Sequence, residues 1–128
     1  MAVELNHTIV WSSDQQASAR FFAGVLGLEP DRFAHFDVVA MANGVSLDFA
    51  DAEGSIAPQH YAFLVSEAEF DAGFAWIAAQ ALPFWADPAR RQPGEINRHW
   101  GGRGVYFEGP DGHFLELLTR PYGKMEDL

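Results

Sequence analysis

Cysteine is absent from this chain of 128 residues, and basic residues are few. Without cysteine, a disulfide framework, a thiolate metal site and a cysteine nucleophile are all excluded. The eight lysines and arginines are outnumbered by eighteen acidic residues, which gives a net charge of −10. Because nucleic-acid binding needs a surplus of positive charge to neutralise phosphates, we expect no nucleic-acid partner.

Long apolar runs are missing as well. The sequence has no apolar stretch long enough to span a membrane, and no basic segment precedes an apolar one as in a secretory signal. With 48% apolar residues, the chain can bury a core within a single domain of this length. We therefore expect a soluble, cytoplasmic protein that does not associate with membranes.

Strand and helix patterns occur twice along the chain. The first half predicts a strand over 4–11, a helix that starts at a Ser13/Gln16 capping box and ends at Gly27, and strands over 33–41 and 45–49 joined by Asn43-Gly44, with one further short strand possible. The second half predicts a strand over 60–65, a helix that starts at a Ser66/Glu69 capping box, and strands over 84–86, 105–107 and 114–118.

An internal repeat follows from these patterns. Moving the first half by 53 residues places His7 on His60, and near the end of each half an acid stands between two large apolar residues, Asp48 in one and Glu116 in the other. The fold class is therefore α+β, with two βαβββ modules in tandem that form a concave mixed sheet with helices on its outer face. Module one covers about 4–50 and module two about 59–120 of a single domain.

The repeat gives each half one histidine and one carboxylate. The apolar residues beside them would pack on a helix, so alternation along a strand places these polar residues on the opposite face of the sheet. A carboxylate is not left in an apolar strand without a partner. Imidazole and carboxylate ligands from His7, His60, Glu116 and Asp48 would suit Fe(II), manganese, nickel or zinc.

The ending Gly109-Pro110-Asp111-Gly112-His113-x-x-Glu116, together with the duplicated module, resembles the vicinal oxygen chelate superfamily. This superfamily includes glyoxalase I, extradiol dioxygenases, fosfomycin-modifying transferases and bleomycin-binding proteins. The resemblance implies a homodimer and a divalent metal ion held by His7, His60 and Glu116. Asp48 stands where glyoxalase I carries a glutamate, and its shorter side chain leaves open whether it also binds the metal.

A second resemblance concerns the reaction. The order Asn97-x-His99, Val105-Tyr106, Gly109-Pro110-x-Gly112 and Glu116 is similar to the extradiol dioxygenase signature. It implies that His99 and Tyr106 carry protons beside the metal, with Glu116 as the third catalytic residue. If the chemistry is instead an isomerisation like that of glyoxalase I, Glu116 or Asp48 would be the general base.

Arg103, Asn97 and Trp100 are the predicted substrate-binding residues. Arg103 lies between glycines and could reach a carboxylate or phenolate, which would suit an anionic substrate. Trp100 and Trp11 could form aromatic walls, whereas His113 is expected to cap a turn or to be exposed, and His35 is given no role. The predicted function is a metal-dependent enzyme acting on a small, anionic or vicinally oxygenated substrate. The alternative is a metal-free protein of the bleomycin-resistance type that sequesters an antibiotic.

Overall fold

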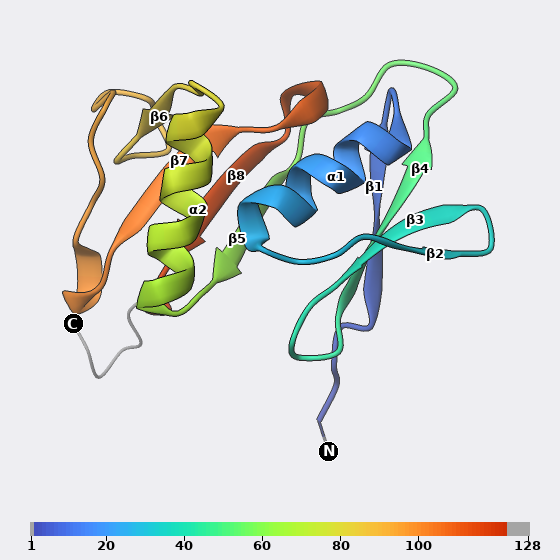
Figure 1. The fold of residues 1–128 in the computed structure, drawn as a ribbon, viewed down its shortest axis with the longest axis horizontal. Coiled ribbons are helices and arrows are strands. Elements are labelled where there is room, and N and C mark those ends of the chain that lie inside the picture. The colour runs from blue at the N-terminus through green and yellow to red at the C-terminus, as the bar shows by residue number, and fades with distance from the viewer. Residues whose placement is uncertain (1, 123–128) are drawn as a thin grey trace. The chain divides into compact units, whose positions relative to one another are not determined.

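The computed structural model describes residues 2–122 of the chain. The chain divides after Ala57 into unit 1 and unit 2, and each unit is described by itself. Unit 1 is one helix on a four-stranded sheet (Figure 1). Its strands lie in the order β1-β4-β3-β2, with β1 parallel to β4 and the other neighbours antiparallel. Its elements are β1 (His7–Ser12), α1 (Gln15–Leu26), β2 (Asp31–Phe33), β3 (Phe36–Ala40) and β4 (Ser46–Asp51).

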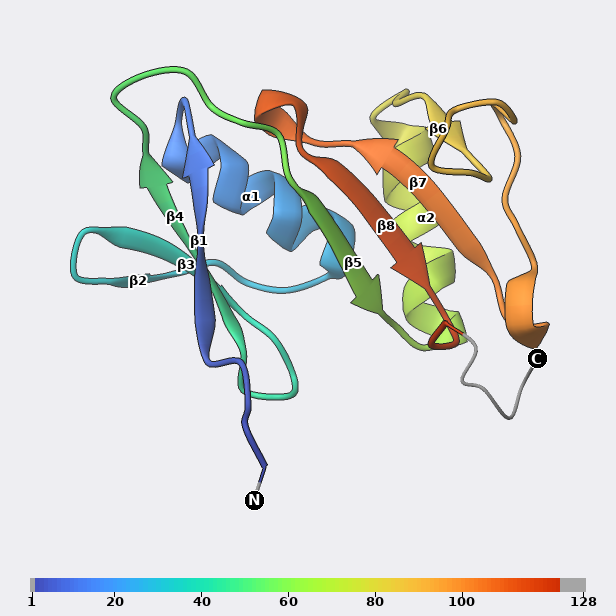
Figure 2. The ribbon, with the colours of Figure 1, turned by 180° about the vertical axis from the view of Figure 1, so that it is seen from behind.

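Unit 2 repeats this arrangement in the order β5-β8-β7-β6. Figure 2 shows β5 and β8 running in the same direction, with β7 reversed beside β8. Both units are βαβββ modules, so the α+β class and the tandem duplication predicted from the sequence are confirmed. The elements of unit 2 are β5 (His60–Leu64), α2 (Glu67–Ala79), β6 (Phe84–Trp85), the 3₁₀ turn η1 (His99–Gly101), β7 (Gly104–Glu108), the 3₁₀ turn η2 (Pro110–Gly112) and β8 (Phe114–Leu118).

The two sheets share one register. The first residue of β1, His7, pairs with the first residue of β4, and the first residue of β5, His60, pairs with the first residue of β8. Asp48 and Glu116 each come two residues later, on β4 and β8 respectively. The extra residues of unit 2 lie in the loop between β6 and β7, so they leave the pairing of these strands unchanged.

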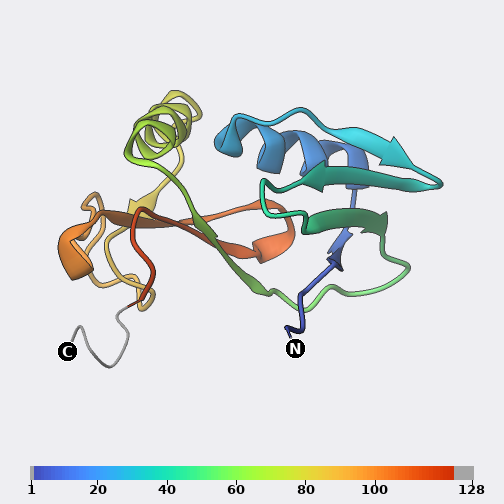
Figure 3. The same cartoon turned by 90° about the horizontal axis from the view of Figure 1, so that it is seen from below.

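One face of each sheet is buried under the helix of its own unit (Figure 3). Phe22 of α1 meets Phe49 of β4 edge to face, with ring centroids 5.0 Å apart. Each such side chain contributes roughly 1.5–3 kcal/mol when it is fully buried. The apolar residues with 0% exposure are Val10, Phe22, Val39 and Phe49 in unit 1, and Phe70, Ile77, Val105, Phe107 and Leu115 in unit 2. The other face of each sheet is therefore the one that carries the predicted polar residues.

Helix α1 begins one residue later than a Ser13/Gln16 capping box would place it, so that prediction is wrong. Asp14 is the N-cap, in extended conformation, and its carboxylate accepts a hydrogen bond from the Ala17 backbone N–H at 3.1 Å. A negative charge at this end is favoured by the helix dipole as well as by the free backbone N–H groups. Gly27 ends α1 in left-handed conformation, as predicted.

Helix α2 begins with the predicted capping box. Ser66 Oγ accepts from the Glu69 backbone N–H at 3.1 Å, and the Glu69 carboxylate accepts from the Ser66 backbone N–H at 2.8 Å. The hydrogen bond from the Ser66 backbone lowers the pKa of Glu69. The ionised Glu69 carboxylate therefore contributes to stability above the pKa of the unfolded chain, about 4.3. This contribution is lost as the pH falls through the lower pKa of the folded protein. Neither helix of residues 2–122 is long and apolar enough to cross a membrane.

The single strand predicted over 33–41 is wrong, because the chain turns back within it. Ala34 has a φ of 55°, and Phe33 at the end of β2 pairs with Phe36 at the start of β3. A left-handed alanine is uncommon, and no glycine or asparagine marks the turn. Pairing of β2 with β3 holds the turn in place, which the local sequence does not reveal.

Replacing Ser66 by alanine should lower the free energy of unfolding by about 1 kcal/mol, because the Glu69 backbone N–H loses its capping acceptor. Urea unfolding at pH 7 measures this change. Ser55→Ala, in the exposed linker ahead of β5, serves as the control and should stay within about 0.5 kcal/mol of the parent. Equal losses in the two variants would show that the cap does not stabilise α2.

Candidate active site

The carboxylate of Glu116 lies in the middle of β8 and is only 2% exposed. Leu115 and Leu117, on either side of it, point into the core under α2, so Glu116 points to the opposite face of the sheet. Tyr106 of β7 pairs with Glu116 in the antiparallel register and lies on the same face. A buried charge of this kind requires hydrogen-bonding or ionic partners.

Two tyrosine hydroxyl groups form part of the hydrogen-bond network around the Glu116 carboxylate. Tyr122, just after β8, donates its hydroxyl hydrogen to Glu116, at 2.8 Å from Oε1 and 3.0 Å from Oε2. Tyr106 Oη lies 3.0 Å from Tyr122 Oη. Because the Tyr122 hydrogen is directed to the carboxylate, Tyr106 is the donor to Tyr122. The hydrogen bonds thus run in one direction, from Tyr106 through Tyr122 to Glu116.

Both tyrosines keep their protons. Burial, the hydrogen bond with Tyr122 and the nearby Glu116 charge raise the pKa of Tyr106 far above its ordinary value. Burial also raises the pKa of Tyr122, although its hydrogen bond with Tyr106 acts in the opposite direction. At neutral pH the site therefore presents two neutral hydroxyl groups beside Glu116.

His60 completes the contacts of Glu116, with Nε2 3.2 Å from Oε1. Its other ring nitrogen, Nδ1, lies 2.9 Å from the carbonyl oxygen of Phe114. A carbonyl only accepts, so Nδ1 carries a hydrogen and Nε2 presents its lone pair to the carboxylate when the ring is neutral. Two acceptors that face one another require a cation between them, either a proton or a metal ion.

The pair fits a divalent metal ion by this criterion. A separation of 3.2 Å between Nε2 and Oε1 is close to the roughly 3.0–3.5 Å between adjacent ligands that each bind at about 2.0–2.2 Å. The hydrogen bond from Nδ1 to a backbone carbonyl is the arrangement that usually orients a metal-binding histidine. Nitrogen and oxygen donors of this kind suit Fe(II), manganese, nickel or zinc.

The other two predicted ligands, His7 and Asp48, belong to unit 1. His7 is exposed, with Nδ1 2.7 Å from Asn6 Oδ1, and Asp48 is buried and accepts a hydrogen bond from Ser46 Oγ at 2.9 Å. Within residues 2–122, no three histidine or carboxylate side chains gather in a cluster that could hold a metal ion. The structure therefore brings together His60 and Glu116, and the roles of His7 and Asp48 stay predictions.

The loop between β6 and β7 forms one wall of a small cavity beside Glu116. The cavity has a volume of about 80 Å³, and His99, Trp100, Tyr106 and Tyr122 are among the residues that line it. Asn97 also lines it and anchors the loop. Its Nδ2 donates to the Ala86 carbonyl at 2.8 Å, and its backbone exchanges two hydrogen bonds with Gly104. The predicted His99 and Tyr106 thus line one cavity with Glu116.

Arg103 lines the same cavity, but its guanidinium is turned towards α2. Its Nε lies 2.8 Å from Glu67 Oε1, and its Nη1 lies 2.8 Å from Asp71 Oδ1. The guanidinium also covers the ring of Phe70, 4.4 Å from its centroid. To bind an anionic substrate as predicted, this side chain would have to exchange both ion pairs.

Two residues of unit 2 differ from what the sequence indicated. Tyr122 was not singled out, because it follows the last strand and only the folded chain brings its hydroxyl to Glu116. His113 is the C-cap of η2, as one of the two expectations had it, but it is 1% exposed rather than exposed. Its Nδ1 accepts from the Gln59 backbone N–H at 3.0 Å. Its position next to Phe114 on the buried β8 gave a signal for burial that the turn residues obscured.

Replacing Gly104 by alanine should disturb the loop that carries His99. The added Cβ would lie 2.8 Å from both the amide nitrogen and the amide oxygen of Asn97, which is too close. We expect a loss of about 1–3 kcal/mol in the free energy of unfolding, measured by urea titration. Gly54→Ala is the control, since nothing lies within 4 Å of its Cβ position. Equal stability of the two variants would show that this contact does not fix the loop.

Comparison with known proteins assigns this chain to a family. The model of the Glyoxalase/Bleomycin resistance protein/Dioxygenase superfamily matches residues 4–117. The structure titled oxidase ChaP-H2 is similar, with 58% identity, a TM-score of 0.93, and coverage of 97% of this chain and 98% of that one. Oxidase ChaP-H1 has 59% identity and a TM-score of 0.93, with coverage of 96% of this chain and 100% of that one.

A more distant structure shares the fold. The fosfomycin resistance protein FosX from Listeria monocytogenes, as a variant in complex with Mn(II) and dihydroxypropylphosphonic acid, has 18% identity and a TM-score of 0.70. Coverage is 98% of this chain and 97% of that one. No curated protein matches the sequence. On the match to the family model and the similarity to the two oxidases over nearly the whole chain, this protein belongs to the Glyoxalase/Bleomycin resistance protein/Dioxygenase superfamily.

Proposed function

We propose that this protein is a metal-dependent oxidase that acts on a small molecule with two neighbouring oxygen atoms and uses dioxygen as the oxidant. The observation that carries the proposal is the identity of 58% and 59%, over nearly the whole chain, with two proteins named as oxidases. The more distant glyoxalase and fosfomycin-resistance structures support the fold alone, so they do not favour isomerisation or thiol transfer.

His60 and Glu116 are the residues that would hold the metal ion, since their facing acceptor atoms call for a cation. His7 is proposed as the third ligand and Asp48 as a possible fourth, from the same chain or from the second copy in the homodimer that the family resemblance implies. Bound there, a divalent ion would supply Lewis acidity towards two neighbouring oxygen atoms of the substrate. Fe(II) is the ion to test first, because the proposed chemistry uses dioxygen.

The directed hydrogen bonds of the tyrosines suit hydrogen bonding to a substrate oxygen beside this site. Tyr106 holds its proton firmly, because burial raises its pKa, and it lines the cavity that holds Glu116. It can donate a hydrogen bond to a substrate oxygen in place of Tyr122. Tyr122 holds the Glu116 carboxylate in place through both oxygens. We assign Tyr106 as a hydrogen-bond donor to a substrate oxygen and Tyr122 as a positioning residue.

His99 is proposed as the general base for a hydroxyl group of the substrate. It stands in the exposed turn η1 at the edge of the cavity, where its ring can meet an entering molecule. The backbone N–H of His99 donates to Asn97 Oδ1 at 3.3 Å, so Asn97 positions it. Trp100 would then pack against the substrate, and Arg103 would fix the loop to α2 unless an anion displaces its carboxylate partners.

A metal-free protein that only sequesters a ligand is the competing class. In such a protein, a carboxylate buried to this degree opposite an imidazole would lower the free energy of unfolding without contributing to ligand binding, since each buried charge costs free energy of folding. The contact between His60 and Glu116 therefore favours the enzyme.

Glu116→Gln keeps the shape of the side chain but removes its charge, so metal binding should weaken by more than the roughly 10–100-fold that loss of an outer contact costs. Protein purified without a histidine tag and loaded with Fe(II), Mn(II) or Zn(II) would be assayed by elemental analysis and by competition with a chelator. Glu108→Gln is the matched control, because Glu108 lies on the neighbouring β7 and is exposed. Equal metal occupancy in both variants would show that the metal site lies elsewhere.

The reaction itself is tested by loading the protein with Fe(II) under nitrogen and adding a panel of catechols and oxygen. We expect oxygen consumption together with the coloured ring-opened or oxidised product. His99→Ala should lower turnover by about a hundredfold if it is the general base. In parallel, protein loaded with nickel or zinc is offered the hemithioacetal of glutathione and methylglyoxal. Isomerisation without oxygen consumption would contradict the proposed oxidase.

A further inference from the structure

The hydroxyl group of Tyr122 lies against both oxygen atoms of the Glu116 carboxylate, at 2.8 Å from Oε1 and 3.0 Å from Oε2. The same Oε1 also faces the His60 imidazole, whose Nε2 is 3.2 Å away. An imidazole, a carboxylate and a phenol thus meet at one place. We propose that Tyr122 becomes a third protein ligand, through its phenolate oxygen, when trivalent iron is bound between His60 and Glu116.

This ligand differs from those that the sequence predicted, which are histidines and carboxylates only. The inference rests on the metal site proposed at His60 and Glu116, but not on the proposed reaction. With a divalent ion, Tyr122 keeps its hydrogen and positions Glu116. With Fe(III), the oxidised state of the ion to be tested first, the same side chain binds the ion directly.

The spacing between the oxygen atoms of Tyr122 and Glu116 fits two ligands of one ion. Oxygen atoms that bind an octahedral ion at about 2.0–2.1 Å lie roughly 2.8–3.0 Å from one another. Tyr122 Oη is already 2.8 Å from Glu116 Oε1. The residue Tyr122 is 59% exposed, so its ring is only partly packed and can follow a small shift of its oxygen. Exchange of the shared hydrogen for a metal ion therefore requires little movement.

The charge of the ion decides whether the phenol gives up its hydrogen. Attraction between a phenolate oxygen and a cation grows with the charge of the cation, so Fe(III) favours the phenolate more strongly than Fe(II) does. Tyrosine is an established protein ligand of iron. On binding, the hydroxyl hydrogen of Tyr122 leaves as a proton to the solvent, as it does when other protonated ligands bind a metal.

Tyr106 supports the phenolate without being a ligand itself. Its hydroxyl lies 3.0 Å from Tyr122 Oη and donates to it, so it can keep donating when that oxygen is negatively charged. The Tyr106 ring stacks on His60 and Phe114, with centroids 6.0 and 5.6 Å apart, and the residue is buried. A hydrogen bond from a fixed group to a ligand atom is the arrangement that usually orients metal ligands.

All three ligands belong to unit 2. His60 begins β5, Glu116 is in the middle of β8, and Tyr122 follows four residues after the end of that strand. The three tyrosines of the chain all come after residue 57, so unit 1 has none. At the position of Glu116, unit 1 has Asp48, which accepts from Ser46 Oγ at 2.9 Å. The duplicated modules therefore differ in this ligand, and the Fe(III) site needs no residue of unit 1.

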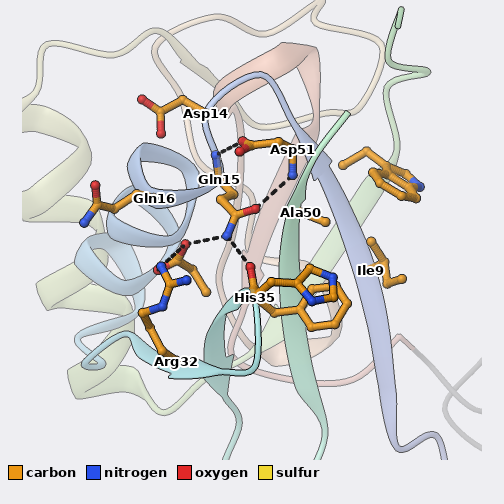
Figure 4. A pocket seen from close by; sticks show the side chains of 11 residues that line it. Ile9, Asp14, Gln15, Gln16, Arg32, His35, Ala50 and Asp51 are labelled. Carbon is orange, nitrogen blue, oxygen red and sulfur yellow. Dashed lines mark hydrogen bonds and ion pairs between the residues drawn. The ribbon is translucent and has the colours of Figure 1, made fainter. Parts of the chain in front are cut away.

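Three aspartates of unit 1 line an open cavity and are the competing place for a highly charged ion (Figure 4). Each of them already accepts a hydrogen bond from α1. Asp14 accepts from the Ala17 backbone N–H at 3.1 Å, and Asp51 accepts from the Gln15 backbone N–H at 2.8 Å. Asp37 accepts from Gln15 Nε2 at 2.8 Å. These carboxylates serve the fold of unit 1, so we expect the iron at Glu116.

The test is visible absorption spectroscopy of the full chain, purified without a histidine tag and titrated with Fe(III) as its nitrilotriacetate complex. A phenolate bound to Fe(III) gives a broad charge-transfer band in the visible range, which carboxylate and imidazole ligands do not give. We expect this band to reach its full height at one equivalent of iron. No catechol is present, so the phenolate can come only from the protein.

The chain has only three tyrosines, so each can be replaced by phenylalanine in turn. Tyr122→Phe should lose the band. Tyr61→Phe should keep the band unchanged, and Tyr106→Phe should keep it at a shifted wavelength, because the phenolate loses a hydrogen bond. Circular dichroism checks that each variant folds.

Elemental analysis of the same samples separates this inference from the metal site on which it rests. Glu116→Gln should lose both the iron and the band, whereas the exposed control Glu108→Gln should keep both. Tyr122→Phe should still bind Fe(II), weakened by no more than the roughly 10–100-fold that loss of an outer contact costs.

One equivalent of Fe(III) that depends on Glu116 but gives no visible band would overturn Tyr122 as a ligand and leave the metal site in place. A band that persists in Tyr122→Phe and disappears in Tyr106→Phe or Tyr61→Phe would also overturn it. Iron bound equally by Glu116→Gln and the parent, or by neither, would overturn this inference and the proposed metal site together. A band lost only in Tyr122→Phe and Glu116→Gln would support it even if no catechol is oxidised.

Discussion

In unit 2, the polar side chains on the free face of the sheet are arranged around one buried carboxylate, which needs partners. Glu116 stands in a strand whose neighbouring residues are leucines, and it is hidden from water. Its charge is tolerated because Tyr122 donates to it from the segment after β8, and because a cation can lie between it and His60 of β5. Each of those partners is in turn oriented by another group, the Phe114 carbonyl for His60 and Tyr106 for Tyr122. A metal ion between His60 and Glu116 would satisfy the same requirement that a shared proton satisfies in its absence.

Duplication explains why such a site can arise at all. Each βαβββ module buries one sheet face under its own helix and leaves the other face free of that packing. Side chains on the free face can therefore change without loss of the core. Unit 1 keeps Asp48 at the position of Glu116 but carries valine, Val38, where unit 2 has Tyr106. Identical registers thus support a polar site in unit 2 and different side chains at the same positions of unit 1.

The sequence was most informative where the pattern is regular and least informative where a contact is distant. The strand over 114–118 and the capping box of Ser66 and Glu69 were predicted correctly, because alternation and capping are local properties. The turn at Ala34 was missed, since an alanine in left-handed conformation is imposed by strand pairing rather than by its own preference. The role of Tyr122 was missed because its partner lies on a different segment.

The sequence by itself determined the α+β class, the duplicated module and the sheet face of each polar residue, because hydrophobic periodicity is written along the chain. It also identified His60 and Glu116 as a pair, through the repeat. Only the tertiary structure decided that Tyr122 hydrogen-bonds to Glu116 and that Arg103 is bound to α2. These facts depend on which strands become neighbours and in which register. Both are decided when residues far apart in the sequence pack together in the core.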